Sequence, residues 1–103
     1  MAIKSTFSFR RVERRIPMEI PVVLEGHRDT PGSESTFTVN VSARGARVTS
    51  TRRWDKDAFL TFASRTGEFR SSARVAYCQP LHGDGYAIGV EFLEPMGRWV
   101  VQS

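Results

Sequence analysis

Residue types that mark several common functional classes are scarce in this chain of 103 residues. Its single cysteine, Cys78, rules out an internal disulfide. Its two histidines, His27 and His82, lie far apart and have no cysteine or histidine at metal-site spacing, so we expect no metal centre. The chain also lacks the spaced nucleophile, base and acid of an enzyme site. We therefore expect neither catalysis nor a cofactor.

Long apolar runs are missing as well. No apolar run approaches the ~20 residues that a helix needs to cross a membrane. The first residues also contain no apolar segment of the kind that directs secretion. From these absences we expect a cytoplasmic protein that binds no membrane.

Lysine is nearly absent although the chain is basic, with a net charge of +4 and with Lys4 and Lys56 as its only lysines. Residues 1–15 contain five basic side chains and one acidic one, whereas the remaining 88 residues contain ten of each. Arginine presents a planar fork that matches phosphate bidentately and stacks on flat rings. A local excess of arginine therefore predicts a phosphate-bearing partner.

Short segments that alternate apolar and polar residues begin at Pro21, and alternation of period two predicts strands. Residues 65–68 and 82–85 have the composition of hairpin turns. Many short strands without a long helical segment indicate an antiparallel barrel or sandwich. The apolar residues expected to line its interior are Val22, Leu24, Phe37, Val39, Val41, Ala46, Val48, Leu60, Phe62, Ala73, Val75, Tyr77, Tyr86, Ile88, Val90 and Phe92.

The chain divides into three parts. Residues 1–20 show no periodicity and are expected to form a flexible basic arm without packing of its own. Residues 21–94 are expected to form the barrel, and residues 95–103 a short C-terminal tail, or a helical turn that Pro95 opens. Trp54 lies in a polar connection, where it either plugs the barrel or makes an exposed contact.

The arm contains Arg11 and Arg15, spaced as Arg-x-x-x-Arg, with Arg10 directly before them. In a helix Arg11 and Arg15 would share one face. In an irregular segment both forks still reach one compact anion. The alternative is a solvated basic tail.

A second polar motif, spaced Asn-x-Ser-x-x-Gly, consists of Asn40, Ser42 and Gly45. It follows an alternating strand, and by itself it is also typical of a plain β-turn. Arg44, inside the turn, reaches either a phosphate or solvent.

In this order, about 25 residues apart, the two motifs resemble the PilZ domain family. Residues 15–22 also look like the entry into that family's first strand, and residues 45–48, 73–78 and 89–92 look like its third, fifth and closing strands. The resemblance covers roughly residues 8–94. It implies a six-stranded antiparallel β-barrel that binds the bacterial second messenger cyclic di-GMP.

The resemblance also implies roles for the arm. Arg11 and Arg15 would hold the phosphates and guanine edges of the ligand, since guanine offers two acceptors that an arginine fork fits. Arg10 implies a preference for an intercalated pair of ligands over a single one. Ligand binding would then order the arm and relay the signal to an unidentified effector protein that controls motility, exopolysaccharide synthesis or other surface behaviour.

For the turn, the resemblance implies that Asn40 accepts hydrogen bonds from guanine N–H groups. Ser42 would bond the ligand or the arm, and Gly45 would let the backbone approach closely. Tyr77 has the phase of a core residue, with stacking on a base as the alternative.

Two other functions stay open. A single-strand nucleic-acid binder on a similar barrel would also use arginines and aromatic side chains. It would spread them over a groove, whereas here the body is neutral, so we expect no specific nucleic-acid partner. The other alternative is a PilZ-fold protein-interaction module without a ligand.

Overall fold

The structure, a computed structural model, describes residues 14–28 and 30–102, and within them every regular element is a β-strand. Two of the strands are only two residues long, β1 (Ile16–Pro17) and β8 (Met96–Gly97). The longer strands are β2 (Pro21–Gly26), β3 (Ser33–Ser42), β4 (Gly45–Ser50), β5 (Phe59–Ser64), β6 (Phe69–Pro80) and β7 (Tyr86–Phe92).

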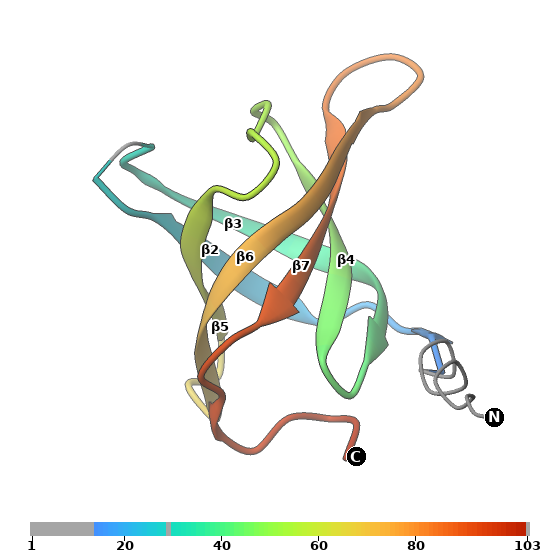
Figure 1. Cartoon of the computed structure of the whole chain (residues 1–103). Coiled ribbons are helices and arrows are strands. Elements are labelled where there is room, and N and C mark those ends of the chain that lie inside the picture. The colour runs from blue at the N-terminus through green and yellow to red at the C-terminus, as the bar shows by residue number, and fades with distance from the viewer. Residues whose placement is uncertain (1–13, 29, 103) are drawn as a thin grey trace, which may run out of the picture.

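The six longer strands close into an antiparallel barrel (Figure 1). Around the barrel the order is β2, β5, β6, β7, β4 and β3, and β3 pairs with β2 to complete the ring. The β5–β6 and β6–β7 hairpins turn where the composition of the chain predicts, and Gly67 and Gly83 in these turns have φ values of 84° and 83°. The predicted six-stranded antiparallel barrel is therefore confirmed.

Most of the predicted interior is also confirmed. Side chains at every second position of the strands fill the barrel, and alternation of this kind leaves one face of each strand to solvent. Tyr86 is half-buried. The predicted interior residues that are buried are Val22, Leu24, Val41, Ala46, Val48, Leu60, Phe62, Ala73, Val75, Ile88, Val90 and Phe92.

The first half of β3 contradicts the prediction. Phe37 and Val39 are 47% and 42% exposed, while Thr36 and Thr38 point inward and are buried. The cause is a β-bulge, because the register with β4 shifts between Thr38 and Asn40 and leaves Val39 as an extra residue. One extra residue reverses which side chains face the core.

The buried threonines are hydrogen-bonded, which is what makes their burial tolerable. The Thr38 hydroxyl donates to the carbonyl of Met18 at 2.6 Å and accepts from the backbone N–H of Ile20 at 2.8 Å. The hydroxyl of Thr36 donates to the carbonyl of Thr49 at 2.8 Å. Thr38 thereby fixes the connection between β1 and β2 against β3.

A buried tryptophan closes each end of the barrel. Trp54 is 2% exposed, its indole N–H donates to the Ser50 hydroxyl at 3.1 Å, and it is therefore a plug. Trp99 packs at the other end, where its ring contacts Phe62, Phe69 and Phe92 with centroid separations of 4.7–5.5 Å. Such aromatic clusters stabilise a core beyond the area that they bury.

The described parts of the two flanks make more contacts with the barrel than their composition indicates. The helical turn considered after Pro95 is not present, because Met96–Gly97 forms β8 on the edge of β6. The segment then runs beneath the barrel (Figure 1). Its Trp99 is part of the hydrophobic core. On the N-terminal side Ile16 and Ile20 pack against the core, although no packing was predicted for the arm.

Candidate functional site

Strand β1 brings the described end of the basic arm to the second motif. Ile16 pairs with Val41 and Pro17 with Asn40, so Arg15 lies beside the end of β3. One guanidinium nitrogen of Arg15, Nη1, donates to the side-chain oxygen of Asn40 at 3.3 Å. The structure therefore places two motifs that are 25 residues apart in direct contact.

The turn from β3 to β4 is built by Ser42 and Gly45, which pair across it. The Ser42 hydroxyl, which is buried, donates to the carbonyl of Gly45 at 3.3 Å and so closes the turn locally. A Cβ atom at Gly45 would lie 2.2 Å from the backbone oxygen of Val90. Glycine is therefore required here for β4 to approach β7, rather than for an unusual φ.

The barrel register aligns two rows of outward-facing residues next to this turn. The first row crosses four strands through Asn40, Arg47, Gly89 and Tyr77. The second row crosses the same strands through Ser42, Gly45, Glu91 and Arg74. The two rows bring together residues that are up to 49 positions apart in the sequence.

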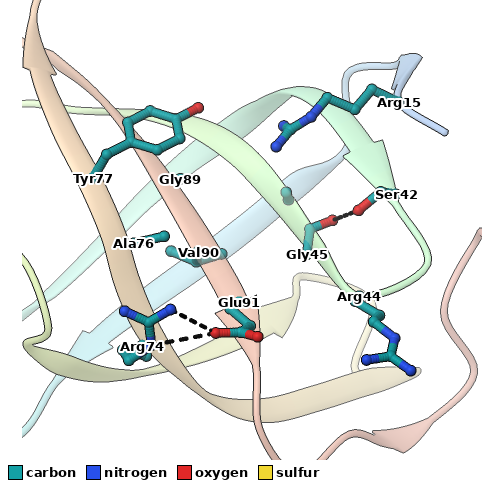
Figure 2. A pocket seen from close by; sticks show the side chains of 11 residues that line it. Arg15, Ser42, Arg44, Gly45, Arg74, Ala76, Tyr77, Gly89, Val90 and Glu91 are labelled. Carbon is teal, nitrogen blue, oxygen red and sulfur yellow. Dashed lines mark hydrogen bonds and ion pairs between the residues drawn. The ribbon is translucent and has the colours of Figure 1, made fainter. Parts of the chain in front are cut away.

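An open pocket of about 280 Å³ lies over these rows, close to the turn (Figure 2). It combines cationic side chains with several small residues, glycine and alanine. Asn40 is not part of its lining but contacts it through Arg15. The lining residues are Arg15, Ser42, Arg44, Gly45, Ala46, Arg74, Ala76, Tyr77, Gly89, Val90 and Glu91.

Tyr77 lies in the pocket and not in the core, so the prediction from its phase is wrong. The register of β6 with β7 shifts between Val75 and Tyr77, and this bulge at Ala76 turns the tyrosine outward. The ring lies against Gly89, where a Cβ atom would come within 2.1 Å of it. Arg47 donates to the tyrosine hydroxyl at 3.0 Å, and its guanidinium carbon lies 5.6 Å from the ring centroid.

Charge in the pocket is mixed. Arg15, Arg44 and Arg74 are cationic, and Glu91 is acidic. Hydrogen bonds to Glu91, and then to Asp57, raise the pKa of Arg74 above its ordinary value. Arg15 and Arg44 are exposed at the rim of the turn. This rim is suited to an anion.

The structure tests the placement of only part of the predicted site. Arg15, Asn40, Ser42 and Gly45 come together as described, whereas Arg10 and Arg11 lie outside the described residues. Trp54 is not part of this group: it is buried and hydrogen-bonded to Ser50, which lies at the opposite end of β4 from the turn.

Sequence reasoning did not include Arg47, Arg74, Gly89 or Glu91 in the site. Strand pairing brings these residues to the site. Counting the strand register from the turns was the signal in the sequence that could have found them.

Other classes of site find little support in the described part of the chain. No group of three or more His, Cys, Asp or Glu side chains there could hold a metal ion. Within the same residues, no helix has the length and apolar character needed to cross a membrane.

Comparisons with known proteins agree with this architecture. The family model of the PilZ domain matches residues 9–98. Among solved structures, the chain is similar to the inhibitor of motility (MotI/DgrA) of Bacillus subtilis, with a TM-score of 0.68 and 18% sequence identity. The likeness covers 82% of this chain but only 43% of the solved one, and at this identity it shows the fold alone. A search of curated proteins found no match.

Proposed function

The chain belongs to the PilZ domain family, and we propose that it is a receptor for cyclic di-GMP that passes the signal to a partner protein. Domains of this family are binding and adaptor modules. The observation that carries the proposal is the contact between Arg15 of the arm and Asn40 of the turn. It supports a single site that uses both motifs.

The chemistry of the pocket rim fits the ligand. Cyclic di-GMP carries two phosphates, and both Arg15 and Arg44 line the pocket, where a phosphate would gain charge-assisted hydrogen bonds from an arginine. Guanine presents O6 and N7 as acceptors, which an arginine fork matches. The ring of Tyr77, half-buried against Gly89, offers a flat surface on which a base could stack.

We propose that Arg10 and Arg11 complete the site from the arm. Together with Arg14 and Arg15 they make four arginines within residues 10–15, and these positive charges repel one another until an anion neutralises them. Binding then fixes the arm over the turn, with Arg10 favouring an intercalated pair of ligands. Ordering a segment consumes part of the interaction energy. An affinity near micromolar, about −8 kcal/mol, is expected.

The relay to a partner is the second half of the proposal. We propose a cytoplasmic adaptor, without catalytic activity, that acts on motility, exopolysaccharide synthesis or other surface behaviour. The solved neighbour is named for inhibition of motility, which is one of these outputs. The likeness covers less than half of that protein, so its partners are not transferred to this chain. The partner of this chain has to be found by experiment.

Replacing Arg15 by alanine tests the site directly. The Arg15→Ala variant loses the contact with Asn40 and one phosphate-binding fork, so its affinity should fall by ~2–4 kcal/mol in isothermal titration calorimetry. The matched control is Arg53→Ala, which removes one positive charge from an exposed pair with Asp55. Arg53 precedes the Trp54 plug, so its loss should leave affinity unchanged.

Two results would contradict the proposal. Equal affinities of wild type and Arg15→Ala would remove the arm from the site. Displacement of cyclic di-GMP by a single-stranded oligonucleotide at physiological salt would favour nucleic-acid binding, which depends strongly on ionic strength.

A further inference from the structure

A carboxylate stands in a pocket that is otherwise suited to anions. Glu91 is the acidic residue among the described residues that line the pocket, where it accompanies three arginines. A site that bound only phosphate would exclude a carboxylate, because like charges repel most strongly at short range. Glu91 therefore needs an explanation that phosphate binding does not provide.

Glu91 is held so that one of its oxygens stays available. Arg74 donates from Nε at 3.2 Å and from Nη2 at 2.7 Å, and both hydrogen bonds end on Oε1 of Glu91. The other carboxylate oxygen, Oε2, accepts no hydrogen bond from any described residue. Figure 2 shows both dashed lines reaching the same oxygen of Glu91.

Arg74, which holds Glu91, is itself held by a second carboxylate, that of Asp57. The third nitrogen of the guanidinium, Nη1 of Arg74, donates to Asp57 at 2.6 Å. Asp57 is a non-glycine residue with a φ of 72°, a conformation that costs energy and is often found near functional sites. The three side chains are partly exposed, and exposed ion pairs contribute little to stability. Their arrangement therefore orients Glu91 more than it stabilises the barrel.

We infer that Glu91 selects guanine over adenine in the ligand, an inference that rests on the proposed function. The Watson–Crick edge of guanine presents two donors, N1–H and the 2-amino group, and Oε2 of Glu91 has two lone pairs that can accept from them. Adenine presents an acceptor, N1, at the corresponding position, and a carboxylate repels it. Asn40 offers a neutral amide oxygen, which is a weaker acceptor than a carboxylate, and this oxygen is shared with Arg15.

The experiment compares cyclic di-GMP with cyclic di-AMP. Calorimetry on the whole chain gives the ratio of the two dissociation constants for wild type and for Glu91→Gln, which keeps the size of the side chain. A glutamine amide can pair with adenine, so the preference for guanine should fall roughly 10- to 100-fold. The control is Glu25→Gln. Glu25 lies on β2, away from the pocket, and forms an ion pair with Arg70 at 3.6 Å, so this variant should keep the wild-type ratio of dissociation constants.

The outcomes separate this inference from the proposed function. If wild type binds cyclic di-GMP and Glu91→Gln keeps the wild-type ratio, the selection of guanine by Glu91 is overturned while the receptor stands. If wild type does not bind cyclic di-GMP, the receptor itself is overturned, and the inference falls with it.

Discussion

Two glycines determine the shape of the pocket for different reasons. At Gly45 an added Cβ would meet the backbone of Val90, which is fixed by the pairing of β4 with β7. At Gly89 it would instead meet the ring of Tyr77, a side chain that can rotate away. Gly45 therefore allows the close pairing of β4 with β7, while Gly89 allows the Tyr77 ring to lie flat on one surface of the site.

This difference gives a prediction for Gly89→Ala. In the wild-type background the added methyl group collides with the Tyr77 ring, and overpacking of this kind costs ~1–3 kcal/mol of unfolding free energy. In a Tyr77→Ala background the same change should cost far less, because the ring is gone. Urea denaturation of the four proteins measures the coupling. Equal costs in both backgrounds would show that the ring does not lie on Gly89.

At the scale of elements, two bulges decide which side chains face the site. The bulge at Val39 turns Phe37 outward and leaves Asn40 beside Arg15. The bulge at Ala76 turns Tyr77 outward onto Gly89. Bulges often occur beside functional sites, where they redirect a side chain.

A matched pair of substitutions on β3 tests the bulge at Val39. Val41 is completely buried, so Val41→Thr should cost ~1–3 kcal/mol, because a hydroxyl enters an apolar interior. Val39 is 42% exposed, and Val39→Thr should stay within about 0.5 kcal/mol of wild type. Thermal or urea unfolding measures both. If the two variants lose the same stability, β3 alternates without a bulge.

The same two bulges mark the limit of prediction from the sequence. Strict alternation in β2, β4 and β7 predicts their interior residues, for example Val22, Val48 and Ile88, because the pattern of each strand is unbroken. It fails at Phe37 and Tyr77, because one extra residue reverses the phase without any change in composition. Glu91 and Arg74 were not predicted for the site, since only strand register brings them there.

At the scale of the whole molecule, both flanks of the barrel meet at the end that carries the turn. Ile16–Pro17 pairs with the end of β3, and Trp99 of the C-terminal segment packs in the core. Figure 1 shows the C-terminal segment passing below the barrel. The indole N–H of Trp99 donates to the carbonyl of Ser42 at 2.8 Å, and the backbone N–H of Phe92 donates to that of Arg44 at 2.8 Å. The turn therefore lines the pocket with its side chains, while two of its backbone carbonyls accept hydrogen bonds from the core residues Trp99 and Phe92.

The most direct test of the account is a titration of the whole chain with cyclic di-GMP, followed through the backbone amide chemical shifts. We expect saturable changes concentrated in residues 40–47 and 89–91, where the arm, the turn and the pocket meet. Residues 51–57, beside the Trp54 plug, should change least apart from Asp57, which Arg74 links to the pocket. An unchanged spectrum at millimolar ligand, or changes confined to the Trp54 end of the barrel, would contradict the account.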